Sequence, residues 1–164
     1  MSSDDMGDEE KAIAVTVLSA IVVLAGLLVY TSLTPVPQKP FISLYYLDSE
    51  KKTENLPELL ILGENNTVLL WVGVENYMGK IEYSSVLVKI GNGTSPVNPS
   101  PADPAYSFEK VLLDKETWEF PLTITINQTG TNRIIFELWL FDESENVFTY
   151  SKSWCSLWLD VLES

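Results

Sequence analysis

The segment NRIIFELWLFDESENVFTYSKSWCSLWLDV, residues 132–161, holds two runs of alternating apolar side chains joined by the polar turn DESEN. This pattern predicts a β-hairpin, because alternation with a period of two is typical of strands with one buried face. One face of the second run consists of Cys155, Leu157, Leu159 and Val161. The opposite face consists of Trp154, Ser156, Trp158 and Asp160. Two tryptophans are a large apolar area to leave in water, so this face is the first candidate for a binding surface.

The same alternation recurs upstream of the hairpin, between polar or Gly/Pro-rich turns. The additional strands are predicted at residues 41–47, 66–76, 82–91, 106–114 and 118–127. Residues 91–105, GNGTSPVNPSPADPA, are too rich in glycine, proline and asparagine for regular structure and are predicted to be a long loop. Seven or eight short strands without an amphipathic helix predict an all-β fold, an immunoglobulin-like β-sandwich over residues 41–164.

The composition excludes several classes of function. The chain of 164 residues has 23 acidic and 10 basic residues, and its net charge of -13 makes it a poor partner for nucleic acids. It has no histidine, which removes the commonest general base and most zinc sites. Its one cysteine, Cys155, cannot form a disulfide within the chain and is expected to be a small buried hydrophobe. We therefore expect no cofactor, no metal site and no enzymatic activity.

The first forty residues predict a membrane anchor. Residues 1–11 are an acidic tail that we expect to be disordered, and residues 12–33 carry no charge. Such a segment can cross the roughly 30 Å hydrocarbon core of a bilayer as one helix, and it is longer than the apolar part of a cleaved signal peptide. Residues 34–40, TPVPQKP, then predict a proline-rich, polyproline-like stalk.

Glycosylation sequons decide the orientation better than the few basic residues do. Three N-x-T acceptors begin at Asn65, Asn92 and Asn127, all after the apolar segment and near predicted turns. They favour a cytoplasmic N-terminus and an extracellular C-terminal domain, so that the protein is a single-pass glycoprotein of the cell membrane.

The order of these pieces resembles a known family. The anchor, FISLYYLD, the run LGENNTVLLWVGVEN and the closing pieces LWLFD, YSKSW and LWLDV are similar to the archaeal family catalogued as domain of unknown function 1616. The resemblance covers residues 41–161 and implies an extracytoplasmic immunoglobulin-like domain on a membrane anchor. Many relatives have several membrane helices, whereas this chain has one. The family has no established activity, so the resemblance implies no catalytic residue.

Tryptophans paired with carboxylates are the candidate binding residues. By alternation Trp71 shares a face with Glu75, Trp139 with Glu137, and Trp158 with Asp160, while Trp154 joins Trp158. An aromatic face can dock onto a protein, and a ring beside a carboxylate also suits a glycan, with Trp71, Trp139 and Trp158 as platforms. The alternative is that the fold itself covers these side chains, for example by the loop 91–105.

Two further motifs leave alternatives open. The turn FDESENV, residues 141–147, gathers oxygen ligands but lacks the spacing of a calcium loop, so a solvated turn is the better interpretation. The junction at Ala12 and Ile13 is similar to a pilin-type cleavage site, which would make the chain a filament subunit. Our main hypothesis is a non-enzymatic module that docks on an envelope or membrane protein; the alternatives are a pilin-like appendage subunit and a surface glycan-binding module.

Overall fold

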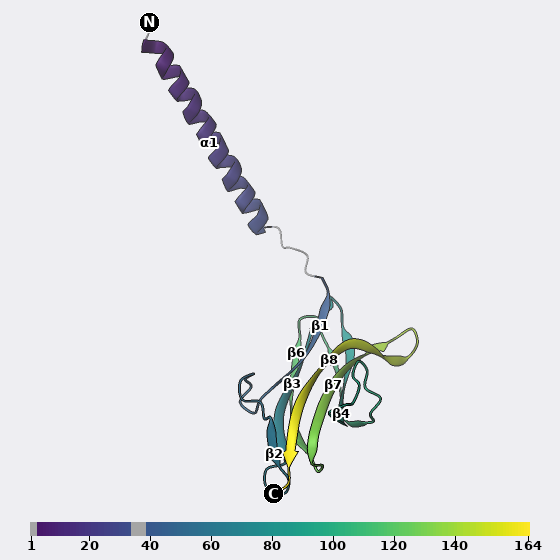
Figure 1. Cartoon of the computed structure of the whole chain (residues 1–164). Helices are drawn as coiled ribbons and strands as arrows, with labels where there is room; N and C mark the ends of the chain where they lie inside the picture. Colours follow the sequence, from purple (N-terminus) through teal and green to yellow (C-terminus); the bar gives the residue numbers. More distant parts are fainter. Residues whose placement is uncertain (1–2, 34–38) are drawn as a thin grey trace. The chain divides into compact units, whose positions relative to one another are not determined.

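The computed structural model describes residues 3–33 and 39–164, which divide into two compact units, Met1–Lys39 and Pro40–Ser164. The predicted stalk lies largely in residues 34–38, outside the described residues. The first unit contains the helix α1, Ser3–Leu33 (Figure 1). Within it, Gly7–Leu33 is long and apolar enough to cross a membrane, and its most apolar 18-residue window has a mean hydropathy of 2.8 and is not buried.

The helix begins earlier than the apolar segment, so the prediction of a disordered tail over residues 1–11 is wrong from Ser3 onward. The sequence at this end is acidic, and negative charge is favourable near the N-terminus of a helix. Lys11 also pairs with Asp8 one turn earlier, with 3.6 Å between Nζ and Oδ1. These local effects explain why the helix extends toward the N-terminus beyond the uncharged segment that would lie in a membrane.

The second unit is a β-sandwich of two sheets. The three-stranded sheet has the order β1-β3-β6, with β1 at Phe41–Leu47, β3 at Thr67–Tyr77 and β6 at Thr117–Thr125. The five-stranded sheet has the order β2-β8-β7-β4-β5. Its strands are β2 Leu59–Ile61, β4 Glu82–Asn92, β5 Pro104–Leu112, β7 Gly130–Asp142 and β8 Val147–Leu162.

The hydrophobic core lies between the two sheets, and the alternating patterns are confirmed. In β3 the inward side chains are Val68, Leu70, Val72 and Val74, and in β8 they are Leu157, Leu159 and Val161. All seven are at most 6% exposed. Such alternation places one apolar face of each sheet against the other, which is the arrangement that stabilises a sandwich.

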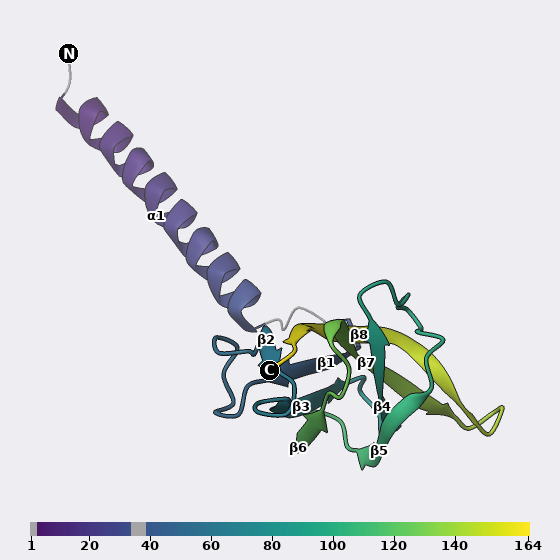
Figure 2. The same cartoon turned by 60° about the horizontal axis from the view of Figure 1, so that its bottom comes forward.

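The predicted hairpin is confirmed as β7 and β8, which pair from Gly130–Val161 to Asp142–Val147. Its tip extends beyond the neighbouring strands in both views (Figures 1 and 2). A bulge interrupts the pairing, because Glu137 lies opposite Trp154 and Trp139 lies opposite Tyr150. The bulge adds two residues to β8, an even number, so the side chains on its two sides keep the same face.

Strand β2 is not apparent in the sequence. It has three residues, too few for an alternating pattern, and it pairs in parallel with the end of β8. The predicted long loop forms between Asn92 and Pro104 and packs on the outer face of the five-stranded sheet, where Ser100 contacts β7. This loop decides which part of that face is accessible.

Candidate functional site

The outer face of β7 and β8 carries a stack of three side chains, Trp154, Arg133 and Trp158. The guanidinium carbon of Arg133 lies 4.4 Å from the ring centre of Trp158 and 5.7 Å from that of Trp154. The register explains the contact with Trp158, which is directly opposite Arg133, whereas Trp154 lies on the same face four residues earlier in β8, opposite Glu137. A cation over an aromatic face is attracted by the ring quadrupole, so the two tryptophans hold the arginine side chain in place.

The terminal N–H groups of the Arg133 guanidinium remain available for a ligand. Its Nε donates to Ser156 Oγ at 3.0 Å, and within the described part of the chain it has no carboxylate within 4 Å. Asp160, two residues from Trp158 on the same face, accepts a hydrogen bond from Thr131 at 2.7 Å. Trp158 is 46% exposed. The face therefore presents a fixed, unpaired guanidinium beside an exposed indole, in a protein that is otherwise strongly negative.

Glu137 is the main correction to the predicted binding set. It is fully buried, and its Oε2 pairs at 2.9 Å with Nζ of Lys89, whose side chain is 7% exposed. The loop between β4 and β5 covers the pair: the Ser100 N–H donates to Glu137 Oε1, and the Ser100 carbonyl accepts from Lys89 Nζ at 2.6 Å. A carboxylate enclosed in this way cannot bind a ligand, so Glu137 is structural.

Trp139 belongs to the same enclosed network. Its Nε1 donates to Glu137 Oε2 at 3.2 Å, and its ring lies 5.5 Å from that of Tyr150. The predicted neighbourhood of Trp139 and Glu137 is thus observed, but it is an internal hydrogen bond rather than a sugar platform. Trp139 and Trp154 are both half-buried, and Trp158 is the exposed indole of this face.

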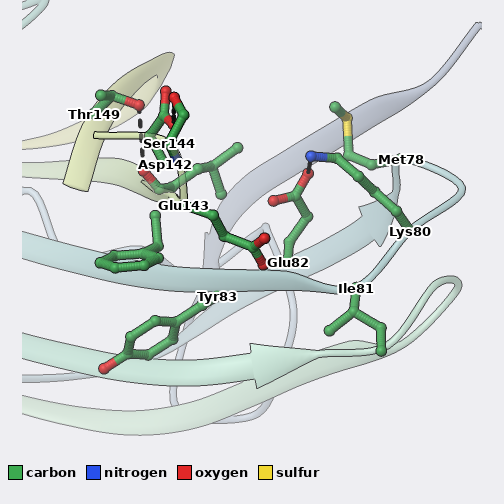
Figure 3. Close-up of a pocket in the computed structure, with 11 residues that line it drawn as sticks. Met78, Lys80, Ile81, Glu82, Tyr83, Asp142, Glu143, Ser144 and Thr149 are labelled. Carbon is green, nitrogen blue, oxygen red and sulfur yellow. Dashed lines mark hydrogen bonds and ion pairs between the residues drawn. The ribbon is translucent and has the colours of Figure 1, made fainter. Parts of the chain in front are cut away.

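The aromatic face continues toward the hairpin tip, a feature that was not predicted from the sequence. Tyr83, Phe141 and Phe148 form a cluster with ring centres 5.0–5.6 Å apart. The signal was present, since Phe141 and Phe148 lie opposite each other in the predicted hairpin. An open cleft of about 610 Å³ adjoins this cluster, between the β3–β4 turn and the hairpin tip (Figure 3).

The acidic turn at the hairpin tip is held by hydrogen bonds among its own residues. Both the N–H and the hydroxyl of Ser144 donate to Asp142 Oδ1, at 2.9 and 2.6 Å, and these bonds lower the pKa of Asp142. Across residues 3–33 and 39–164, no three His, Cys, Asp or Glu side chains are grouped to hold a metal ion. The geometry fits the solvated turn that the sequence favoured.

Trp71 and Glu75 lie on the other sheet, so the six predicted binding residues do not form one surface. Lys51 Nζ lies 4.0 Å above the Trp71 ring and pairs with Glu119 at 2.7 Å. Hydrogen bonds from the Lys51 side chain and, to a smaller extent, from the Tyr45 hydroxyl lower the pKa of Glu119. Because lysine occupies the ring face, Trp71 is less suited to stack on a sugar. Alternation within single strands could not show that β3 and β8 belong to different sheets.

The remaining predicted sites are all accessible. Asn65, Asn92 and Asn127 are exposed in or beside turns. Ala12 and Ile13 are exposed within α1, in a helix that continues on both sides. The filament hypothesis stays a prediction, and a mature N-terminus at Ile13 would be its direct sign.

Cys155 faces the core, and burial raises the pKa of its thiol from about 9 to about 12. We expect less than one percent thiolate at pH 8, because each pH unit below the pKa costs a factor of about ten. The native protein should then react at least tenfold more slowly with a thiol-specific disulfide reagent than the urea-unfolded protein. Since the unfolded thiol ionises first, this residue's contribution to stability should fall between about pH 9 and pH 12. Equal rates in both states would contradict the burial.

The sheets, their order and the apolar helix define a class: an immunoglobulin-like β-sandwich domain that follows one candidate membrane-spanning helix. No family model matches the chain, and no curated protein matches its sequence. The resemblance to the archaeal family thus stays a prediction.

Solved structures with the same fold exist at low identity. The CARDB domain of the PF1109 protein from Pyrococcus furiosus, solved in complex with di-metal ions, is 19% identical with a TM-score of 0.51, and the match covers 79% of this chain and 94% of that one. A β-glucosidase from Listeria innocua is 14% identical with a TM-score of 0.51 over 76% of this chain and 16% of that one. The chain thus spans about a sixth of the enzyme. These likenesses show the fold alone.

Proposed function

We propose that the chain is a non-enzymatic, membrane-anchored module whose extracellular β-sandwich docks onto a carboxylate-bearing surface of an envelope or membrane protein. Arg133, fixed between Trp154 and Trp158 without an acidic partner of its own among the described residues, is the observation that carries this proposal. Tryptophan and arginine are the residues most enriched among those that dominate binding at protein interfaces. The sequence resemblance and the candidate membrane span are consistent with an extracytoplasmic domain.

Charge complementarity specifies the partner's chemistry. A guanidinium presents parallel N–H donors that match a carboxylate, and stacking on two indoles leaves those donors directed away from the rings. Arg133 is the only arginine of a chain with net charge -13. An acidic partner would be repelled by most of this domain, so the docking contact must be local, with a carboxylate placed at Arg133 and apolar surface against Trp158.

The geometry favours this proposal over a glycan platform. A sugar stacks on an open ring face, whereas Lys51 lies over Trp71 and Arg133 lies over Trp158. Glu137, which the glycan hypothesis needed as a hydrogen-bond acceptor, is enclosed by Lys89 and Ser100.

The test is crosslinking and capture of the tagged full-length protein from its native membranes, with variants that separate the two sheets. We expect one stoichiometric partner that is lost, by at least tenfold, in both Arg133→Ala and Trp158→Ala, because truncating a central interface residue costs about 2 kcal/mol or more. Trp71→Ala is the matched control, since it removes an indole from the opposite sheet, and it should capture the partner as the native chain does. Urea denaturation of each variant verifies folding.

Arg133→Lys refines the same experiment. Lysine keeps the charge but loses the paired donors, so capture should fall by less than with alanine. Equal capture by the native chain, Arg133→Ala and Trp158→Ala would overturn the proposal, as would an equal loss with Trp71→Ala.

A further inference from the structure

The three sequons gather at one end of the β-sandwich, which we call the far pole. Asn65 precedes the start of β3, Asn127 follows the end of β6, and the first residue of β3 pairs with the last of β6. Asn66 Nδ2 joins the two turns by donating to the Ile126 carbonyl at 3.0 Å and to Asn127 Oδ1 at 3.3 Å. Asn92 and Asn127 border one shallow cleft of about 510 Å³.

The chain enters the sandwich at the opposite pole. Phe41, the first residue of β1, pairs with Tyr77, the last residue of β3. The eleven residues of β3 thus separate the entry pole from the far pole by about 33 Å, at roughly 3.3 Å per residue. All three sequons therefore lie at the pole remote from the chain entry.

The side-chain amides divide the asparagines into two groups. In Asn66, Asn76 and Asn132 the Nδ2 group donates to backbone carbonyls and so serves the fold. In the sequon residues Asn65, Asn92 and Asn127 the Nδ2 group makes no hydrogen bond within the described part of the chain, and both the asparagine and its threonine are exposed. Asn55, Asn98 and Asn146 are exposed as well, but none of them begins a sequon, since Asn98 precedes a proline and the other two lack a Ser or Thr two residues on.

The sequon at Asn92 is already folded into a compact turn. Asn92 Oδ1 accepts hydrogen bonds from the Thr94 N–H at 3.0 Å and from the Thr94 hydroxyl at 2.9 Å. These bonds occupy the carbonyl oxygen, while the Nδ2 group, which is the atom that a glycosyl transfer modifies, makes no hydrogen bond among the described residues. A Cβ on the adjacent Gly93 would lie 3.6 Å from the Trp158 ring, so the backbone of this turn borders the exposed indole.

We propose that the far pole is N-glycosylated at Asn65, Asn92 and Asn127. In each transfer the Nδ2 atom forms a bond to the anomeric carbon of a lipid-phosphate-linked oligosaccharide, the bond from that carbon to the phosphate oxygen breaks, and Nδ2 loses one proton. The glycans cap the pole remote from the chain entry. They leave the sheet face between Trp154 and the hairpin tip open, the glycan of the Asn92 turn adjoins the docking residue Trp158, and all three require this domain to lie on the exported side of the membrane.

Intact-mass measurement of the full chain from its native membranes tests the proposal. The mass should exceed 18.4 kDa, and each of Asn65→Gln, Asn127→Gln and Thr94→Val should remove one glycan mass. Thr94→Ser should retain the glycan, because serine preserves the sequon and the hydroxyl that bonds Asn92. Asn55→Gln is the matched control, since Asn55 is exposed outside any sequon.

Three separate mass steps support the proposal. It is overturned if the native chain shows no added glycan, if fewer than three steps are lost, or if Asn55→Gln removes a step. The measurement is independent of any partner, so it can fail while the docking proposal stands, and the reverse.

Discussion

Replacing Glu137 by alanine is expected to lower the free energy of unfolding of the β-sandwich by about 3–5 kcal/mol, because it leaves Lys89 buried without its counter-charge. The substitution also removes the acceptor of the Ser100 N–H and of the Trp139 indole. The loop between β4 and β5 should therefore loosen from the outer face of β7. Urea denaturation of the full chain in detergent, followed by tryptophan fluorescence, measures the change.

Two variants identify the cause of that loss. Glu50→Ala breaks an ion pair with Lys52 of similar length, 2.7 Å, but both side chains are more than half exposed, so we expect about 0–1 kcal/mol. The double variant Lys89→Met/Glu137→Leu removes both charges together and should recover most of the stability. A cost below about 1 kcal/mol for Glu137→Ala would contradict the enclosed pair.

Asn76 is the second residue whose loss should be severe. It is fully buried at the end of β3, where its Nδ2 contacts the carbonyls of Lys80, Leu112 and Leu113 at 2.9–3.1 Å. Its Oδ1 accepts from the Met78 N–H at 3.0 Å. One amide thus holds the β3–β4 turn against the β5–β6 turn, and these turns connect the two sheets.

Asn76→Ala is expected to cost about 3 kcal/mol in the same denaturation experiment, because each unsatisfied buried polar group costs about 1–3 kcal/mol. Asn76→Asp should cost at least as much, since a carboxylate would face three carbonyl oxygens. Asn55→Ala, an exposed asparagine, should change stability by no more than about 0.5 kcal/mol. Comparable effects at Asn76 and Asn55 would show that the clamp does not form.

Much of the sandwich could be predicted because the patterns that define its strands and turns lie within short stretches of the chain. The period-two alternation in β3, β6 and β8 identified the buried faces residue by residue, and the DESEN turn identified the hairpin. The uncharged run after Lys11 identified the candidate span. Each of these signals depends only on neighbours in the chain, so a strand or helix carries it before any packing occurs.

The candidate site could be predicted only in part. Alternation placed Trp154 and Trp158 on the outward face of β8, as observed. It could not assign Trp71 to the opposite sheet, nor show that Glu137 meets Lys89 beneath Ser100, because those contacts join residues that are remote in sequence. Arg133 was overlooked for the same reason, since its stacking partners lie on the next strand.

The sequence by itself thus determined the helix, the two-faced strands and the exclusion of histidine chemistry and of disulfides within the chain. Only the tertiary structure decided which polar side chains are free. Glu137 is enclosed while Arg133 lies half-buried without a carboxylate partner among the described residues, and the Nδ2 groups of Asn76 and Asn132 are bonded while those of the sequon residues Asn65, Asn92 and Asn127 are not. The physical reason is that a polar group's availability depends on the partners that folding brings to it, and these come from other strands and loops.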